Sequence, residues 1–228
     1  MTTAIIVASG SSRRMGFDKL MAPLAGKPVL AHSLAAFDRC QEVGQIIVVT
    51  DEARFNSLDL SGLRYHVLRV DGGKERQDSV ANGLAALSPD CDIVAIHDGA
   101  RPLISTESIL LALDAAAVHG SSALAHPITE TLKRADGDDF VKDSVSREDL
   151  WAMETPQCFR VRLLQAAYQE VAKDGLHVTD EVSALQHLGH AIKLVSNPSP
   201  NPKVTFPSDL ILAEQLLAAA ALSSHPAK

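Results

Sequence analysis

The sequence has few cysteines, no long apolar run and no excess of positive charge, and each of these absences removes a class of protein. Cys40, Cys91 and Cys158 are odd in number and far apart. This spacing excludes a disulfide framework and a zinc site, and it is typical of reduced thiols in a cytoplasmic protein. No stretch approaches the roughly 20 apolar residues that span a bilayer, so we expect no membrane partner. The formal net charge of −7 argues against binding to nucleic acid.

The remaining composition is that of an ordinary folded domain. The 228 residues are 46% hydrophobic and 21% charged, a balance that is usual for globular proteins. A chain of this length buries roughly 70–75% of the surface that it exposes when unfolded. We therefore expect a single domain over residues 1–228, with one large core.

Short apolar runs alternate with helical patterns along much of the chain. Residues 4–9, 45–50 and 92–98 are rich in β-branched residues and lack polar alternation, which is typical of strands covered on both faces. Between and after them, residues 75–87 and 105–120 have apolar residues at helical spacing. This order predicts an α/β fold, a Rossmann-like three-layer sandwich with a mostly parallel sheet. Ligands of such sheets bind beyond the carboxyl ends of the strands.

Residues 130–150 interrupt this pattern. Two short strand-like runs, TLKR and FVKDSV, flank an acidic turn that contains Gly137. We interpret this segment as a protruding β-hairpin arm. The α/β pattern then resumes, with helices expected at about 160–173, at 179–188 and from 208, and a strand at 192–196.

A small-residue loop with three cations follows the first strand. Residues 5–19 read IIVASGSSRRMGFDK, so Arg13, Arg14 and Lys19 crowd one loop of an acidic protein. The loop matches neither a Walker A motif, because Lys19 is followed by Leu20, nor a G-x-G-x-x-G fingerprint. It is either a turn with surface cations or a loop whose N–H groups and cations surround a polyphosphate. Its place after a parallel strand favours the second interpretation.

Seven segments along the chain together resemble one enzyme family. The first, ASGSSRRMGFDK, resembles the signature loop of the sugar-nucleotide-type nucleotidyltransferases. The others are GGKERQDSV (72–80), HDGARP (97–102), ETLKR (130–134), SVSREDLWAMETPQ (144–157), VTDEVSAL (178–185) and NPKVTFPSDLILAE (201–214). With all seven, the chain resembles nearly end to end the 2-C-methyl-D-erythritol 4-phosphate cytidylyltransferases of the non-mevalonate isoprenoid pathway.

The resemblance implies transfer of CMP from CTP to 2-C-methyl-D-erythritol 4-phosphate, with release of pyrophosphate. The substrate phosphate attacks the α-phosphorus of CTP in line, and catalysis of such a step is mostly positioning and electrostatic stabilisation. The implied cofactor is Mg²⁺, held chiefly by the triphosphate, with Asp98 as its protein contact. Two alternatives stay open, namely the same transfer to ribitol 5-phosphate and a nucleotide-binding protein without catalytic activity.

The resemblance also implies which residues act. Arg14 and Lys19 fall on positions that bind the triphosphate, Arg147 on one that positions the polyol phosphate, and Lys203 on one near the attacking phosphate. All four are implied catalytic residues, and their joint presence argues against an inactive protein. The implied nucleotide-binding residues are Ala8, Ser9, Gly10, Gly72, Gly73, Ser79 and Asp98. The implied substrate-binding residues are Asp98, Arg101, Thr131, Arg147, Thr155 and Thr179.

Three residues of these motifs have structural interpretations that stay open beside the functional ones. Arg101 is equally suited to brace the loop after Asp98, and Thr179 to cap the following helix. His97 alternates with Asp98 along a strand, so we expect its side chain in the core.

In this family, the arm is supplied by the neighbouring subunit. The resemblance therefore implies a homodimer that exchanges arms, in which Thr131 and Arg147 serve the partner's site. A two-stranded hairpin is marginally stable by itself, which is consistent with an arm that packs on another subunit.

Overall fold

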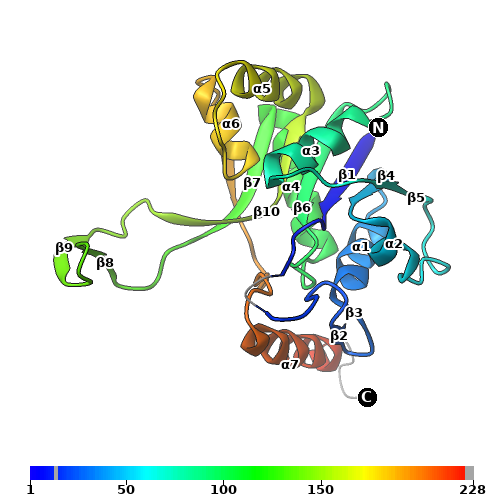
Figure 1. The fold of residues 1–228 in the computed structure, drawn as a ribbon, viewed down its shortest axis with the longest axis horizontal. Helices are drawn as coiled ribbons and strands as arrows, with labels where there is room; N and C mark the ends of the chain where they lie inside the picture. The colour runs from blue at the N-terminus through cyan, green and yellow to red at the C-terminus, as the bar shows by residue number, and fades with distance from the viewer. Residues whose placement is uncertain (13–14, 224–228) are drawn as a thin grey trace.

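A seven-stranded β-sheet runs through the centre of the protein (Figure 1), with its strands in the order β11-β7-β10-β6-β1-β4-β5. The structure is a computed structural model that describes residues 1–12 and 15–223. The strands of this sheet are β1 (Thr2–Val7), β4 (Val43–Val49), β5 (Val67–Val70), β6 (Ile93–Asp98), β7 (Ser121–Pro127), β10 (Trp151–Arg160) and β11 (Lys193–Ser196). Neighbouring strands are parallel except where β10 pairs with β6 and β7. The predicted fold class, an α/β sandwich around a mostly parallel sheet, is confirmed.

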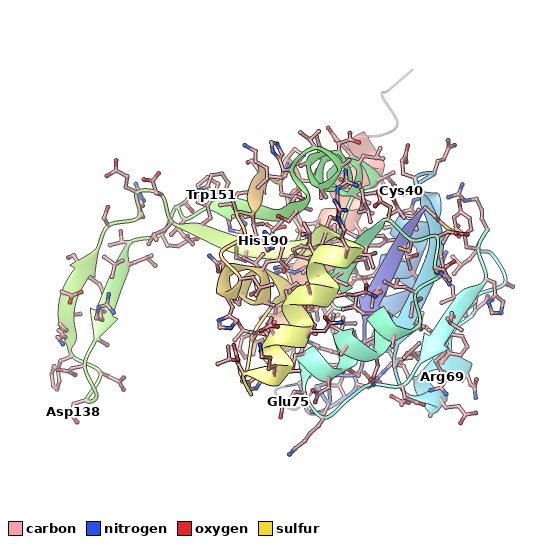
Figure 2. The ribbon with its side chains drawn as sticks, turned by 90° about the horizontal axis from the view of Figure 1, so that it is seen from above. Cys40, Arg69, Glu75, Asp138, Trp151 and His190 are labelled. Atoms are coloured by element: carbon pink, nitrogen blue, oxygen red, sulfur yellow. The ribbon has the colours of Figure 1, made fainter. Side chains whose placement is uncertain are left out.

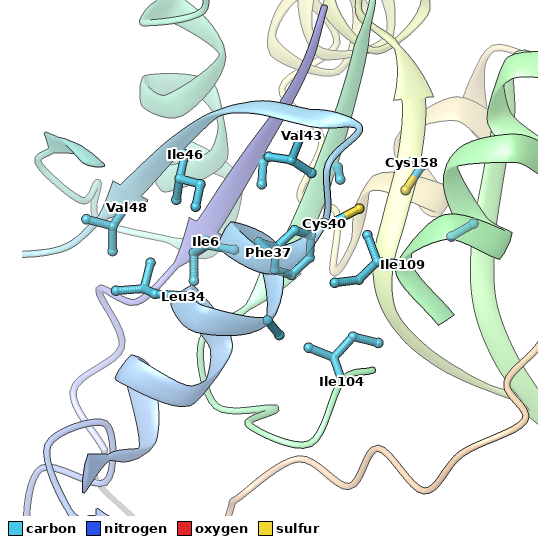
Figure 3. Packing of buried hydrophobic residues seen from close by; sticks show 14 of the residues in the cluster. Ile6, Leu34, Phe37, Cys40, Val43, Ile46, Val48, Ile104, Ile109 and Cys158 are labelled. Atoms are coloured by element: carbon cyan, nitrogen blue, oxygen red, sulfur yellow. The ribbon is translucent and has the colours of Figure 1, made fainter. Parts of the chain in front are cut away.

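Helices cover both faces of this sheet. The helices in the described ranges are α1 (Val29–Arg39), α2 (Glu52–Asn56), α3 (Arg76–Ala85), α4 (Thr106–His119), α5 (Val161–Lys173), α6 (Glu181–His187) and α7 (Pro207–Ser223). On one face, α1 and α4 contribute Leu34, Phe37 and Ile109 to an apolar cluster with the strands (Figure 3). On the other face, α3 and α6 contribute Val80 and Leu185 to a second cluster, in which α5 also takes part.

Alternate residues of the central strands point to opposite faces of the sheet. In β1, Ile6 joins the cluster of α1 and α4, whereas Ile5 joins the cluster of α3, α5 and α6. In β6, Ala95 and Ile96 divide in the same way. All four side chains are fully buried. Both faces of these strands are covered by helices, which is why residues 4–7 and 93–96 are uninterrupted apolar runs.

Local signals place the ends of α4 where the sequence predicts them. The hydroxyl of Ser105 accepts a hydrogen bond from the backbone N–H of Ser108 at 3.1 Å, as an N-cap residue does. At the other end, Gly120 has φ 86°, a left-handed conformation that glycine adopts without strain.

Three strands of the sheet, β5, β7 and β10, are not predicted by the sequence pattern. The buried part of β10 includes Glu154, Thr155 and Gln157. Polar residues at buried positions remove the apolar run that marks a strand in the sequence. Their polar groups form hydrogen bonds with neighbouring segments instead, as buried polar groups generally do.

The predicted arm is present as a separate two-stranded hairpin, made of β8 (Leu132–Ala135) and β9 (Val141–Val145). Figure 2 shows Asp138 at the far end of the arm and Trp151 where the chain returns to the sheet. A second small hairpin, β2 (Pro23–Leu24) and β3 (Lys27–Pro28), lies against α7. Within the described ranges, none of the helices combines the length and apolar character that a membrane span requires.

Candidate active site

A cavity of about 610 Å³ opens at the carboxyl ends of β1 and β6. Four segments that are far apart in the sequence meet there: the loop after β1, the start of α3, the end of β6 and the loop before α7. The register of the sheet places Val7 beside Asp98, so the ends of the two strands coincide. This is the edge at which the sequence predicts a ligand.

The cavity brings together most of the residues that the sequence assigns to the nucleotide. The predicted residues that line it are Ala8, Ser9, Gly10, Lys19, Gly73, Ser79, Asp98 and Lys203. Arg14, together with its neighbour Arg13, lies outside the described residues. The predicted residues that do not line it are Gly72, Arg101, Thr131, Arg147, Thr155 and Thr179.

Gly72 and Gly73 bring the backbone before α3 against its neighbours. A Cβ atom added to Gly72 would lie 2.3 Å from the Cβ of Ser9, and one added to Gly73 would lie 2.2 Å from the Cβ of Asp78. Real Cβ atoms do not approach each other so closely, so glycine is required at both positions for this packing. Of the two, Gly73 lines the cavity, so a residue without a side chain forms this part of its wall.

Ser79 links the two loops that form this wall. Its hydroxyl lies 2.9 Å from the hydroxyl of Ser9 and accepts a hydrogen bond from the backbone N–H of Gly73 at 3.0 Å. It also donates to the carbonyl of Glu75 at 3.1 Å. The residue is 1% exposed. Its hydroxyl is therefore engaged by groups of the protein, and it holds the loops in place.

Asp98 lies between two cations at the floor of the cavity. One carboxylate oxygen accepts a hydrogen bond from the Lys203 ammonium at 2.5 Å, and the other lies 3.4 Å from the Arg76 guanidinium. Burial alone would raise the pKa of the Asp98 carboxyl, but Lys203 and Arg76 more than offset it and hold that pKa well below its usual range. Asp98 is therefore ionised at neutral pH.

Arg76 also lines the cavity, although the motifs by themselves do not mark it as a site residue. Its guanidinium forms a paired contact with the carboxylate of Glu181, at 2.6 and 3.0 Å, and the hydroxyl of Tyr168 donates to the same carboxylate at 3.0 Å. Glu181 is fully buried, and a buried carboxylate needs such partners. Both residues stand in recognised motifs, GGKERQDSV and VTDEVSAL, but neither motif shows that they meet.

Lys19 reaches across the cavity mouth to the loop that carries Lys203. Its ammonium donates to the carbonyl of Val204 at 2.7 Å, and its backbone N–H donates to the hydroxyl of Ser12 at 3.3 Å. Two lysines from opposite ends of the chain thus face one space. The described charged residues that line the cavity are Lys19, Lys74, Arg76 and Lys203 against Glu75 and Asp98. Such an excess of cations in an acidic protein suits a polyanionic ligand.

The carboxylates of the cavity do not form a ready-made metal cage. Within the described ranges, no group of three or more histidine, cysteine, aspartate or glutamate side chains lies close enough to hold a metal ion. Asp98 is ionised and lines the cavity. This arrangement fits an ion such as Mg²⁺ that binds mainly through substrate phosphates and one protein carboxylate.

Thr155 and His97 support Asp98 from behind. The Thr155 hydroxyl accepts a hydrogen bond from the backbone N–H of Asp98 at 3.1 Å and lies 3.0 Å from Nδ1 of His97. His97 is fully buried against the ring of Phe37, with ring centroids 5.0 Å apart, as its alternation with Asp98 predicts. Burial lowers the pKa of His97 to about 4, so its ring is neutral at pH 7.

Arg101 is a brace in this structure, in line with one of the two interpretations of its sequence. Its guanidinium donates to the backbone carbonyls of Asn201 at 2.7 Å and Met153 at 3.3 Å. It therefore ties the loop after β6 to β10 and to the loop that carries Lys203.

Thr179 is exposed and does not cap α6. The N-cap residue is Asp180, whose carboxylate accepts a hydrogen bond from the backbone N–H of Ser183 at 3.0 Å. The interpretation of Thr179 as the cap is therefore wrong, because the helix begins one residue later and a carboxylate occupies the capping position.

Thr131 and Arg147 lie on the arm, which extends away from the sheet (Figure 1). Both are exposed, and the Arg147 guanidinium donates to the carbonyl of Thr129 within the arm itself. The structure therefore does not bring the predicted polyol-phosphate residues to the cavity of their own chain.

Comparison with known proteins gives a consistent result along the chain. The sequence profile of the family described as 2-C-methyl-D-erythritol 4-phosphate cytidylyltransferase matches residues 2–219. A relative with that name from Dehalococcoides mccartyi is 42% identical over 219 residues, which cover 94% of this chain and 95% of the relative. Another, from Caldanaerobacter subterraneus, is 40% identical over 222 residues, with 94% and 98% covered. The crystal structure of the enzyme so named from Thermus thermophilus matches with a TM-score of 0.81 at 30% identity, and covers 96% of this chain and 100% of its own.

Proposed function

This chain belongs to the 2-C-methyl-D-erythritol 4-phosphate cytidylyltransferase family, and we propose that the cavity at the carboxyl ends of β1 and β6 is where it carries out the family's reaction. The enzyme transfers CMP from CTP to 2-C-methyl-D-erythritol 4-phosphate and releases pyrophosphate. The observation that carries the assignment of the cavity is that Lys19 and Lys203, from opposite ends of the chain, both line it beside the ionised Asp98. A phosphoryl-transfer reaction needs cations at the reacting phosphates.

The loop after β1 binds the triphosphate of CTP. Lys19, Ser9 and Gly10 all line the cavity. Arg14 has the same role by its place in the motif. Backbone N–H groups and cations that already face the phosphates stabilise the charge that develops on the equatorial oxygens.

Lys203 binds the attacking phosphate. An oxygen of the polyol phosphate forms the new bond to the α-phosphorus of CTP, and the bond from that phosphorus to the pyrophosphate oxygen breaks. The ammonium of Lys203 is held by Asp98 at 2.5 Å, so its direction is set before the substrate arrives. A cation fixed in this way lowers the cost of bringing two anionic phosphates together.

The cytosine base lies against the part of the cavity wall that Gly73 forms. Gly73 and Lys74 line the cavity there. Because Gly73 has no side chain and one would collide with Asp78, we assign reading of the base edge to the backbone of Gly73. Ser79 contributes by holding Ser9 and Gly73 together. Its role in nucleotide binding is therefore to position these loops.

Mg²⁺ is the cofactor that fits these residues, and Asp98 is the residue that would hold it together with the triphosphate. When bound, the ion neutralises phosphate charge and polarises the phosphoryl oxygens. The residues of the chain determine where the triphosphate lies, through Lys19 and the loop after β1.

The arm completes the site of a neighbouring subunit in a homodimer. Support comes from its exposure, since the tip carries Phe140 and Val141 at 71% and 68% exposed, and from Arg147, which does not line the cavity of its own chain. Exchange of arms buries these apolar side chains and delivers Arg147 and Thr131 to a polyol phosphate.

The test is release of pyrophosphate from CTP with purified protein and Mg²⁺. We expect turnover with 2-C-methyl-D-erythritol 4-phosphate and much slower turnover with ribitol 5-phosphate at equal concentration. CTP is expected to be preferred over UTP. Equal or faster turnover with ribitol 5-phosphate would contradict the assigned substrate, and no turnover with either polyol phosphate would contradict the reaction.

A further inference from the structure

Arg54 lies outside the cavity but binds the loop that lines it. The residue belongs to the one-turn helix α2, which follows β4. Its side chain is 10% exposed, although α2 lies at the surface. One guanidinium nitrogen donates to the carbonyl of Ala8 at 2.7 Å, and the Nε–H donates to a carboxylate oxygen of Asp18 at 2.9 Å.

These two contacts lie at opposite ends of the loop after β1, residues 8–19. Ala8 is the first residue after β1, and it precedes Ser9 and Gly10 of the cavity lining. Asp18 immediately precedes Lys19, whose ammonium crosses to Val204. A single guanidinium therefore joins the start of the loop to its end.

The guanidinium is itself held in place by β4 and by its own helix. It donates to the hydroxyl of Thr50 at 3.1 Å and to the carboxylate of Asp51 at 2.8 Å. The Thr50 hydroxyl also donates to the carbonyl of Ala8 at 3.2 Å. The loop is thus attached to the carboxyl end of β4, next to its own strand in the sheet.

We propose that Arg54 is a positioning residue for CTP: it joins the two ends of the loop after β1, so that the loop backbone and Lys19 face the triphosphate. This inference rests on the proposed function of the cavity. Arg54 does not line the cavity, so it acts through Ala8 and Asp18 and not by contact with the nucleotide. A loop that is closed beforehand loses less conformational freedom when the ligand binds.

The test compares Arg54→Met with a matched arginine variant at the other edge of the sheet. Arg160 also joins a carboxylate to a backbone carbonyl, with contacts to Asp92 and Ala117 at 2.9 Å each, but it lies at the amino end of β6. We expect Arg54→Met to weaken CTP binding by about tenfold to a hundredfold, as loss of hydrogen bonds to a charged group does. Arg160→Met is expected to bind CTP as the wild type does, whatever its melting temperature.

Equilibrium binding of CTP and steady-state kinetics provide the readouts, with melting temperatures for every variant. KM for CTP should rise in Arg54→Met, whereas KM for the polyol phosphate should stay within about twofold of the wild type, because that substrate does not bind the loop. Arg54→Lys keeps the charge without the forked donors, and its KM for CTP is expected to lie between those of the wild type and Arg54→Met.

Asp18→Asn tests the same contact from the other side. In the wild type, a carboxylate oxygen of Asp18 accepts a hydrogen bond from the backbone N–H of Leu20 at 3.1 Å. The asparagine amide keeps an oxygen for this bond but removes the charge that faces Arg54. We expect Asp18→Asn to weaken CTP binding, and the double variant to be no weaker than Arg54→Met alone. Additive losses would overturn the proposal.

Two further results would also overturn it. One is wild-type affinity for CTP in both Arg54→Lys and Asp18→Asn. This result can be obtained even if Arg54→Met fails to fold. The other is an equal loss of affinity for CTP in Arg160→Met. Failure of the proposed function is distinguishable from these results, because the wild type itself would then bind no CTP or release no pyrophosphate.

Discussion

The ammonium of Lys203 and the carboxylate of Asp98 lie 2.5 Å apart, and they come from residues 105 positions apart in the sequence. Arg76 approaches the other oxygen of the same carboxylate at 3.4 Å. The side chain of Asp98 is 13% exposed and that of Lys203 is 39% exposed. The carboxylate is therefore the more buried partner, and the lysine is the one accessible from the cavity. The buried carboxylate fixes the direction of a lysine that faces the cavity.

Replacement of Lys203 by methionine should lower kcat more than it raises KM. The ammonium is expected to bind charge that develops in the transition state, and only such interactions raise the rate constant. Loss of one such contact slows a reaction by roughly a hundredfold or more. Steady-state kinetics with both substrates measures the change, with Lys203→Arg as the variant that keeps a charge. A kcat near that of the wild type in Lys203→Met would contradict this role.

Replacement of Asp98 by asparagine should raise the Mg²⁺ concentration needed for half-maximal activity. Asp98 is the carboxylate that we assign to the metal, and loss of one charged ligand weakens Mg²⁺ binding by about tenfold or more. The measurement is a Mg²⁺ titration at saturating CTP. Glu75→Gln is the matched control, because Glu75 also lines the cavity. Tight binding of Mg²⁺ to the wild type without CTP would be inconsistent with an ion held chiefly by the triphosphate.

Mixing two inactive variants should restore activity if the arm serves the partner's site. Arg147→Ala and Lys19→Ala are combined under conditions that exchange subunits. In a mixed dimer, one site carries both lesions and the other carries neither. Half of the dimers then have one intact site of two, so activity should recover toward about a quarter of the wild type. No recovery, although mixed dimers are detected by mass spectrometry, would show that Arg147 acts in its own subunit.

Gly73→Ala should weaken CTP binding with little effect on the polyol phosphate. The added Cβ would lie 2.2 Å from the Cβ of Asp78 and 2.9 Å from its carbonyl carbon, so the backbone that faces the cavity must move. We expect KM for CTP to rise about tenfold, since a displaced backbone loses hydrogen bonds to the ligand. Gly62→Ala is the control, because nothing lies within 4 Å of the Cβ position there. Equal effects of the two variants would contradict the steric explanation.

The neutral state of His97 should make the protein less stable as the pH falls from about 6.5 toward 4. Burial lowers the pKa of His97 from 6.5 to about 4. Below pH 6.5 the unfolded chain therefore binds a proton that the folded protein does not, and unfolding becomes more favourable. At pH 4.5 this amounts to roughly 2–3 kcal/mol relative to pH 7.

Urea unfolding at pH 7 and pH 4.5 measures the effect of His97, with His97→Gln as the variant that cannot titrate. Other groups contribute equally to both proteins, so the difference in their pH dependence isolates the histidine. His97→Gln is expected to lose less stability than the wild type over this range. The same loss in both proteins would show that the ring is protonated in the folded state.

The order of strands and helices could be predicted from the sequence where one local signal is enough. In β1 and β6, both faces are buried, so residues 4–7 and 93–96 are continuous apolar runs that mark the two strands in the sequence. The ends of α4 are set by Ser105 and Gly120, which act within their own turn. β10 was not predictable in this way, because Glu154 and Gln157 are buried in it and are satisfied by residues far along the chain.

The motif segments also contain most of the residues that line the cavity, but they do not show how these residues are arranged. Gly73, Lys19, Asp98 and Lys203 stand in recognisable segments, and the fold brings them to one edge of the sheet. Arg76 stands in one of these segments as well, yet nothing in its neighbourhood in the sequence indicates a buried carboxylate as its partner. Glu181 is 105 residues away.

By itself, the sequence determined the class of fold and the arm, because apolar runs, capping residues and turn residues act over a few residues, and the family motifs marked the segments that line the cavity. Only the tertiary structure decided that Asp98 pairs with Lys203, that Ser79 is turned toward Ser9, and that Arg54 joins the two ends of a loop. These contacts depend on which strands are neighbours in the sheet. That order is set by the burial of all the strands and helices together, and not by any one segment.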